Sequence, residues 1–211
     1  MTILESLRRH QVVAVLRAPD HASAMRGVAA VVAGGVRAIE VTYSTPQAAR
    51  VIRDLRAEHA DIVVGAGTVT TATQVAESVA AGAEFLVCPG TAPAVASAMR
   101  ESGTPYLLGA LTPTEVMTAV DLGAEIVKLF PGSLGGPGYL RTLRGPFPVV
   151  PLMPTGGVSI GNARAWLDAG AVCLGAGSEL ASRDLLAAGD DAEITRRARA
   201  FMAAVESRSP A

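Results

Sequence analysis

The chain has 211 residues, of which 50% are hydrophobic and 18% charged, and its formal net charge is -1. This size and composition predict one packed globular domain over residues 1–211 and exclude a disordered chain. The near-neutral charge and an aromatic content of 4% argue against a nucleic-acid partner. The longest apolar runs are strand-sized, which argues against a membrane span or membrane partner, and the absence of a signal-like N-terminus predicts a cytoplasmic protein.

Short apolar runs alternate with longer helical patterns along the chain. The predicted strands are Val12–Leu16, Ala38–Thr42, Ile62–Gly65, Glu84–Val87, Tyr106–Gly109, Glu125–Leu129, Val149–Met153 and Ala171–Leu174. The predicted helices are His21–Ala33, Pro46–Glu58, Thr71–Ala81, Pro93–Ser102, Thr114–Leu122, Ile160–Ala169 and Ala192–Glu206, the last followed by a short frayed tail. Strands that alternate with helices of this length predict βαβ units and a parallel sheet.

Several glycines lie where a predicted helix ends and the next predicted strand is about to begin. Such glycines suit the left-handed residue that ends a helix, and they stand at Gly35, Gly82, Gly103, Gly123 and Gly170. Eight units in so short a chain predict an α/β fold of the (β/α)₈ (TIM) barrel type with a C-terminal helix. The alternative, a doubly wound open sheet, usually carries an early glycine-rich dinucleotide loop, and none follows the first strand.

The cysteines and histidines offer no metal site. Cys88 and Cys173 each lie in an apolar strand-like run, so we expect buried free thiols. The three histidines, His10, His21 and His59, are scattered among polar residues and are interpreted as surface side chains. No spacing of cysteine and histidine is typical of zinc.

Two charged residues stand inside predicted strands. In the sixth strand Val127 and Leu129 suit the helix side, which turns Lys128 toward the barrel interior, and the same alternation in the second strand turns Glu40 inward. Lys128 is also the one lysine among 18 basic residues, and arginine cannot supply a neutral amine. Both residues stand in the later half of their strands, toward the end of the barrel where active sites lie.

This arrangement has two interpretations. A structural ion pair between Glu40 and Lys128 is one, because ion-pair networks also place charges in cores. The other is catalytic: a buried lysine that loses its proton is a nucleophile toward carbonyls, and Glu40 would move the protons that imine formation requires. The functional interpretation is favoured by the position of both residues.

Polar and glycine-rich segments follow several strands. Thr155, Gly156 and Gly157 follow the seventh strand and Gly177 and Ser178 the eighth, where such barrels often bind phosphate. Thr68, after the third strand, is a candidate for a substrate carboxylate or for the cap of the next helix. Arg17, after the first strand, is a candidate anion ligand or an exposed charge. Pro89 and Phe130 are expected to bind substrate, and the segments that begin at Pro89 and Pro131 to line the mouth of the barrel.

These residues resemble the family of 2-keto-3-deoxy-6-phosphogluconate (KDPG) aldolase and 4-hydroxy-2-oxoglutarate (KHG) aldolase. Four motifs carry the resemblance: Ile39-Glu40-Val41-Thr42, Gly65-Ala66-Gly67-Thr68-Val69, Val127-Lys128-Leu129-Phe130-Pro131 and Met153-Pro154-Thr155-Gly156-Gly157-Val158. It implies a class I aldolase that cleaves KDPG to pyruvate and glyceraldehyde 3-phosphate, or KHG to pyruvate and glyoxylate.

The resemblance also implies individual roles. Lys128 is the Schiff-base lysine, Glu40 the proton-transferring acid and base, and Thr68 a ligand of the pyruvate carboxylate. Thr155 matches a position near the substrate hydroxyl that is linked to stereochemical control. Such enzymes need no metal or cofactor, take a 2-keto acid and a sugar phosphate, and are typically homotrimers.

One departure from the family pattern concerns the carboxylate. The pattern places a carboxylate-binding arginine four residues after the glutamate, where this chain has Ser44. Related members without that arginine carry one after the first strand, so we expect Arg17 to replace it. Aldolases for 2-keto-3-deoxy-6-phosphogalactonate share that arginine, so the chain could instead act on that substrate. The same loops would also suit a phosphate-binding barrel enzyme without a Schiff base, or a non-catalytic sugar-phosphate sensor.

Overall fold

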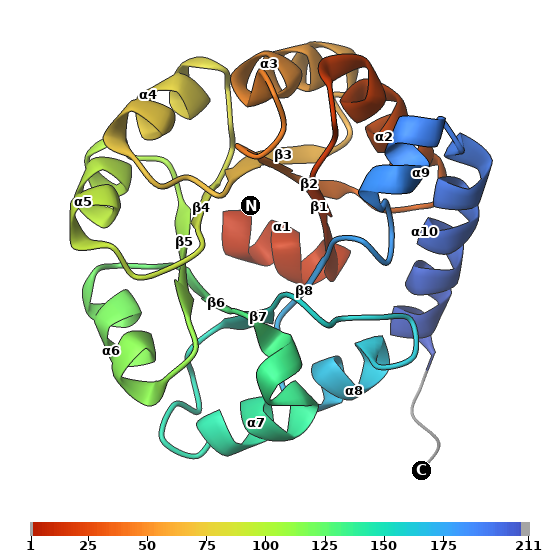
Figure 1. Cartoon of the computed structure of the whole chain (residues 1–211). Coiled ribbons are helices and arrows are strands. Elements are labelled where there is room, and N and C mark those ends of the chain that lie inside the picture. Colours follow the sequence, from red (N-terminus) through yellow and green to blue (C-terminus); the bar gives the residue numbers. More distant parts are fainter. Residues whose placement is uncertain (1, 208–211) are drawn as a thin grey trace.

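The computed structural model describes residues 2–207 and has a parallel barrel at its centre (Figure 1). Its strands are β1 (Val12–Leu16), β2 (Ala38–Thr42), β3 (Val63–Gly67), β4 (Leu86–Cys88), β5 (Tyr106–Ala110), β6 (Ile126–Leu129), β7 (Leu152–Pro154) and β8 (Leu174–Ala176). They form one eight-stranded sheet in the order β7-β6-β5-β4-β3-β2-β1-β8. The predicted (β/α)₈ barrel is confirmed, and the open-sheet alternative is wrong.

The barrel closes between β7 and β8 through two backbone contacts. The Val172 N–H donates to the Leu152 carbonyl over 2.9 Å. A parallel bridge pairs Thr155, the residue after β7, with Gly175 inside β8. The closing seam therefore brings together the two loops that the sequence predicts to bind phosphate.

Helices surround the barrel, one after nearly every strand (Figure 1). They are α2 (His21–Ala33), α3 (Ala48–Glu58), α4 (Ala72–Ala80), α5 (Pro93–Glu101), α6 (Pro113–Asp121), α7 (Gly136–Leu143), α8 (Ala163–Asp168), α9 (Arg183–Ala188) and α10 (Asp191–Glu206), with a 3₁₀ turn at Gly132–Leu134. The predicted glycine stops at residues 35, 82, 103, 123 and 170 all have positive φ, between 71° and 104°. These positions favour glycine because a Cβ strains the left-handed conformation.

Alternation along each strand divides the apolar side chains between two cores. Val127 and Leu129 pack in the layer between strands and helices, as predicted. A second cluster fills the barrel interior and consists of Leu7, Val13, Ala38, Phe85, Val87, Leu107, Ile126, Met153 and Cys173. The interior is therefore a packed core, and the polar side chains of the site lie at its other end.

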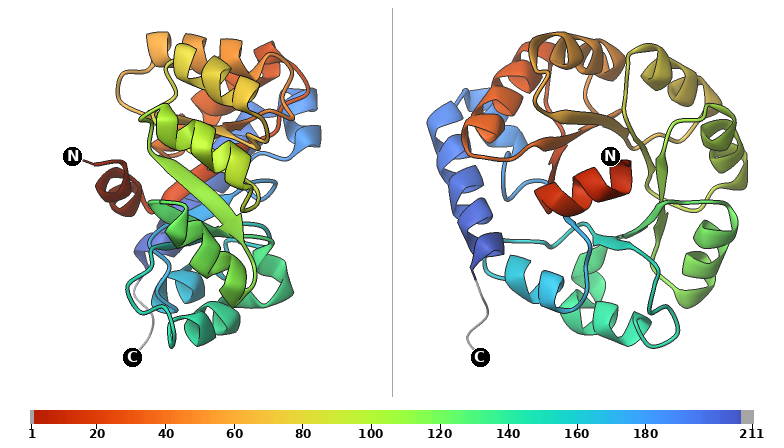
Figure 2. Two further views of the ribbon diagram at one scale, coloured as in Figure 1. Left: turned by 90° about the vertical axis from the view of Figure 1, so that its left-hand side faces the viewer. Right: turned by 180° about the vertical axis from the view of Figure 1, so that it is seen from behind.

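The interior core is closed at one end by a helix that the sequence analysis missed. Figure 2 shows α1 (Ile3–His10) lying across the end of the barrel from which the strands start. Leu7 of this helix is fully buried in the interior cluster. A capping box between Thr2 and Glu5 starts α1, and this Thr-x-x-Glu pattern is the signal that could have predicted it.

The last two strands begin later than predicted. Val149, the predicted start of the seventh strand, is 85% exposed, and β7 begins at Leu152. The carbonyl of Val150 instead accepts a hydrogen bond from Arg144 over 2.6 Å. The eighth strand begins at Leu174 and also ends later than predicted, at Ala176. It includes Gly175, which has no apolar side chain that could indicate a strand. Helices α7 and α9 were also not predicted; both are short.

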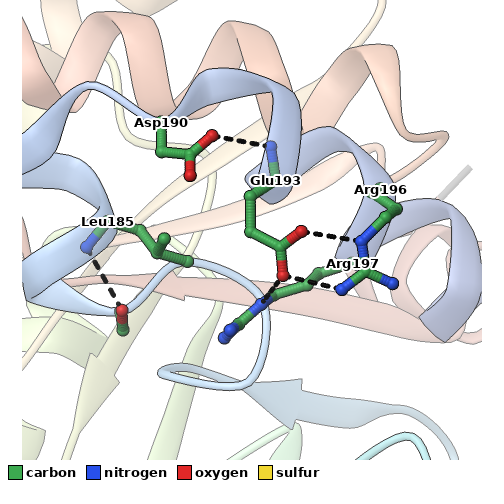
Figure 3. A network of polar contacts seen from close by, with 6 residues as sticks. Leu185, Asp190, Glu193, Arg196 and Arg197 are labelled. Carbon is green, nitrogen blue, oxygen red and sulfur yellow. Dashed lines mark hydrogen bonds and ion pairs between the residues drawn. The ribbon is translucent and has the colours of Figure 1, made fainter.

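The predicted C-terminal helix is confirmed as α10, which begins at Asp191 (Figure 3). The Asp190 carboxylate caps it by accepting from the Glu193 N–H over 3.1 Å. Hydrogen bonds from Arg196 and Arg197 lower the pKa of Glu193 to about 2. The predicted tail beyond Ser207 lies outside the described residues.

The expectations drawn from composition have mixed outcomes. Cys88 and Cys173 are buried free thiols, as predicted. The three histidines are half-buried rather than on the open surface, and His21 pairs with Asp54 at 2.8 Å. Between residues 2 and 207, no helix has the length and apolar character needed to cross a membrane.

Leu7→Ala tests the contribution of α1 to stability. We expect the free energy of unfolding to fall by about 2–5 kcal/mol, because the change leaves a cavity in a fully packed barrel floor. Urea denaturation followed by circular dichroism measures it. Leu134→Ala is the matched control, since Leu134 is 71% exposed and its truncation should change stability by less than about 0.5 kcal/mol. Equal effects of the two changes would contradict this role.

Candidate active site

A buried ion pair crosses the barrel between β2 and β6. The Lys128 Nζ lies 2.9 Å from Glu40 Oε1 and 3.3 Å from Oε2. Lys128 is 3% exposed and Glu40 is completely buried. Two charges this deep are stable only together, because removing one partner leaves an uncompensated charge that costs about 3–5 kcal/mol.

Gly67 of β3 makes room for the Glu40 side chain, whereas Gly65 makes room for Phe85. In the strand register Glu40 lies opposite Gly65, and Thr42 lies opposite Gly67. A Cβ on Gly67 would stand 2.1 Å from Glu40 Oε1, which is far inside van der Waals contact. Gly67 was not predicted as a site residue, although a glycine within a strand often indicates that another group approaches closely.

A cavity of about 170 Å³ lies at the carboxyl ends of the strands, and neither Lys128 nor Glu40 is among the residues that line it. Its lining includes seven residues predicted from sequence: Arg17, Phe130, Thr155, Gly156, Gly157, Gly177 and Ser178. The Phe130 ring connects the cavity to the ion pair, since its centroid lies 5.8 Å from the Lys128 Nζ. The fold therefore assembles residues from several strand ends around one small space.

Thr155 and the two glycines after it line this cavity. The Thr155 hydroxyl is buried and has no hydrogen-bond partner among the described residues. Gly175 gives it space, since a Cβ there would stand 2.1 Å from Thr155 Oγ1. Gly156 and Gly157 have φ of 82° and 76°, a conformation suited to glycine.

Two hydrogen bonds of the Asn162 side chain hold the loop that contains Gly156 and Gly157 in place. The Asn162 side chain donates to the Gly157 carbonyl over 2.8 Å and accepts from the Ser159 N–H over 2.8 Å. Ser159 also lines the cavity. These hydrogen bonds fix the conformation of the loop, and a loop with a fixed conformation loses less entropy when it binds a ligand.

Thr68 and Pro89 lie outside the lining of this cavity. Thr68 does not cap a helix, so that alternative is wrong: the cap of α4 is Thr71, whose hydroxyl accepts from the Gln74 N–H. Thr68 instead has φ of 55°, an uncommon conformation for a β-branched residue and one that clusters at functional sites. Thr68 follows Gly67, the residue packed against Glu40. Pro89 is half-buried, and its carbonyl lies against Gly109, the register partner of Lys128.

Arg17 is exposed and borders a second cavity of about 220 Å³. This space also touches Ser44, Ser178 and Arg183. Arg183 is the first residue of α9, and the sequence analysis missed it because α9 was not predicted. The two cavities share Val15, Arg17 and Ser178, so they adjoin.

Neither the Cys88 thiol nor the outer surface adds a reactive group to this site. Burial raises the pKa of the Cys88 thiol, against smaller opposite effects of nearby backbone hydrogen bonds and Lys128, which argues against a second nucleophile. A larger open groove of about 600 Å³ lies on the outer surface between α2 and α10. Over residues 2–207, no cluster of three or more His, Cys, Asp or Glu side chains could hold a metal ion.

Sequence and structure comparisons agree with this geometry. The family model described as KDPG and KHG aldolase matches residues 3–197. The KHG/KDPG aldolase of Escherichia coli K12 is 41% identical over 189 residues, covering 89% of this chain and 87% of that protein.

Two solved structures are similar over almost the whole chain. The KDPG aldolase of Legionella pneumophila, with pyruvate captured as a covalent carbinolamine, superimposes with a TM-score of 0.87 at 29% identity, covering 95% of this chain and 98% of that one. The KDPG aldolase of Zymomonas mobilis ZM4, with 3-phosphoglycerate, gives a TM-score of 0.82 at 32% identity, covering 94% of each chain. This chain belongs to the KDPG and KHG aldolase family and is an enzyme of the class I, pyruvate-dependent aldolase type.

Proposed function

We propose that this enzyme cleaves a 4-hydroxy-2-keto acid, KDPG or KHG, reversibly, with Lys128 as the nucleophile and Glu40 as the proton-transferring group. The observation that carries the proposal is the buried contact of 2.9 Å between the one lysine and a glutamate, beside a cavity that faces the strand ends. The carbinolamine of pyruvate in the Legionella relative supports the same chemistry here.

The ion pair provides a path to a neutral amine. Transfer of a proton from the Lys128 Nζ to Glu40 Oε1 turns two buried charges into two neutral groups, and burial favours neutral groups. The free amine then attacks C2 of the keto acid. The protonated Glu40 supplies the proton that the departing water needs when the carbinolamine becomes an imine.

Carbon–carbon cleavage follows from the imine. Glu40, a carboxylate again after the water has left, accepts the proton of the C4 hydroxyl; the C3–C4 bond breaks, and its electron pair moves toward the imine to form an enamine. An aldehyde leaves as the C4 fragment. Glu40 returns the proton to C3 of the enamine, and addition of one water hydrolyses the imine to pyruvate and the free amine. We assign the contact with the C4 hydroxyl of the substrate to Thr155, because its unpartnered Oγ1 is a free hydrogen-bonding group in the cavity.

The remaining predicted residues have binding roles in this proposal. The N–H groups of Gly156, Gly157 and Gly177 and the Ser178 hydroxyl receive the substrate phosphate, and the 3-phosphoglycerate in the Zymomonas relative supports a phosphate ligand. Arg17 and Thr68 receive the C1 carboxylate. Phe130 and Pro89 enclose the reacting carbons.

We also propose that residues 1–211 form one domain, that the enzyme is a homotrimer and that it is cytoplasmic. Exposed apolar side chains on α6, Met117 at 57% and Val120 at 43%, are a surface that another copy could cover. Free thiols at Cys88 and Cys173 agree with a reducing compartment.

Pyruvate and sodium borohydride test the nucleophile. We expect reduction to trap one pyruvate per chain, and peptide mass analysis to map it to Lys128, because the chain has no second lysine. Lys128→Arg keeps the charge beside Glu40 but has no neutral amine, so it should abolish both trapping and turnover. Turnover that survives in Lys128→Arg would contradict the mechanism, and circular dichroism checks its folding.

Glu40→Gln tests the proton transfer. The amide keeps the shape of the side chain but cannot exchange protons, so we expect kcat to fall about 10²–10⁴-fold. Pyruvate release, coupled to a dehydrogenase, measures it. Glu84→Gln is the control, because Glu84 also forms an ion pair, with Arg56 at 2.6 Å, but near the surface. A normal kcat in Glu40→Gln would remove this residue from the mechanism.

Gly67→Ala tests the positioning of Glu40. The added Cβ would overlap Glu40 Oε1 and push the carboxylate away from Lys128. We therefore expect kcat to fall at least about 10-fold, with a smaller change in KM. Gly138→Ala is the matched control, since no atom lies within 4 Å of a Cβ at that position on α7. Equal kcat values in the two variants would show that Gly67 does not position Glu40.

A further inference from the structure

The second cavity at the mouth of the barrel carries two positive charges and no negative one. Arg17 reaches it from the end of β1, and Arg183 from the start of α9. None of the residues that line it is acidic. Within residues 2–207, neither of these arginines forms an ion pair with a carboxylate.

Two guanidinium groups that share one space of about 220 Å³ repel each other unless an anion lies between them. Guanidinium groups suit a carboxylate or phosphate because both offer oxygens to a planar set of donors. The cavity therefore has the charge and size of an anion subsite. Its remaining polar groups, Ser44 and Ser178, are hydroxyls that can donate as well.

The position of the cavity indicates which anion it receives. The Ser44 hydroxyl lies 2.7 Å from the Thr42 hydroxyl, and Thr42 follows Glu40 by two residues on the same inward face of β2. One wall is thus continuous with the strand that presents Glu40. The glycines that we assign to the phosphate do not line this space, whereas Ser178, which we also assign to the phosphate, borders both cavities.

Arg17 connects this space with the glycine-lined cavity. Its Nη1 lies 3.9 Å from the point that a Cβ would take on Gly177. A substrate whose phosphate occupies the glycine loops would therefore leave the second cavity for another anionic group. In a 2-keto acid that group is the C1 carboxylate, bonded directly to the carbon that Lys128 attacks.

We propose that Arg183 is a substrate-binding residue that receives the C1 carboxylate of the 2-keto acid together with Arg17. Ser44 is small enough to leave room for this second guanidinium. The proposal rests on the proposed function, because it takes pyruvate as the ligand whose carboxylate is bound. Arg183 sets the affinity for the keto acid and leaves the bond-breaking steps to Lys128 and Glu40.

Borohydride trapping over a range of pyruvate concentrations tests the proposal. In Arg183→Gln we expect the half-saturating pyruvate concentration to rise about 5- to 10-fold, because the variant loses one partly exposed charge-assisted contact. The amount of pyruvate trapped at saturation should stay the same. With methyl pyruvate, which has no carboxylate charge, the same variant should trap like the unaltered enzyme. Arg53→Gln, an exposed arginine on the outer helix α3, is the control and should change neither curve.

A compensating change provides an independent readout. Ser44→Arg would place a guanidinium on another residue that lines the same cavity, so the double variant with Arg183→Gln should recover the affinity for pyruvate. Recovery separates a role in binding from a merely structural one. Arg183 is exposed, so its replacement should leave the fold intact.

Several outcomes would overturn the proposal. An unchanged pyruvate curve in Arg183→Gln, or equal shifts for pyruvate and methyl pyruvate, would show that Arg183 does not bind the carboxylate. A rise in KM confined to phosphorylated aldehydes would assign Arg183 to the phosphate instead. Absence of trapping at Lys128 in the unaltered enzyme would instead refute the proposed function, so the two failures are distinguishable.

Discussion

The contact between the Lys128 ammonium and the Glu40 carboxylate is the interaction on which the site depends. Neither charge is stable alone at 3% and 0% exposure, so each requires its partner. The contact also constrains its surroundings. Gly67 must lack a side chain because the Glu40 carboxylate occupies that space, and the register of β2 against β3 places the glycine there.

The barrel interior has an apolar half and a polar half. Leu7 of α1 closes the end from which the strands start, and a cluster of apolar side chains fills the space above it. Lys128, Glu40 and Thr155 lie nearer the carboxyl ends of the strands. A packed floor keeps water from one side of the ion pair, so ligands reach it from the mouth. This arrangement strengthens the electrostatic interactions within the site.

In the proposed site, the mouth of the barrel separates two kinds of anion-binding group. Backbone N–H groups of the loops after β7 and β8 are one kind, and Gly156 and Gly157 after β7 have positive φ. Guanidinium groups lie over the ends of β1 and β8, at Arg17 and Arg183. Two distinct subsites suit a substrate with two anionic ends, and Arg17 borders both of them. The distance between the anions then becomes a determinant of specificity.

The helix–strand alternation, the inward direction of Lys128 and Glu40 and the glycine helix stops could all be predicted, because each follows from local periodicity or backbone conformation. The start of β7 could not, because the Val150 carbonyl accepts a hydrogen bond from Arg144. The extension of β8 to Ala176 could not either, because Gly175 has no apolar side chain. The resemblance to a known family added roles that periodicity cannot supply.

The sequence by itself determined that one lysine and one glutamate point into a barrel, since side chains alternate along every strand. Only the tertiary structure decided that they touch, that Gly67 lies against the carboxylate and that Arg183 shares a cavity with Arg17. These contacts join residues far apart in the chain. Their distances depend on the closure and register of the barrel, which no local pattern encodes.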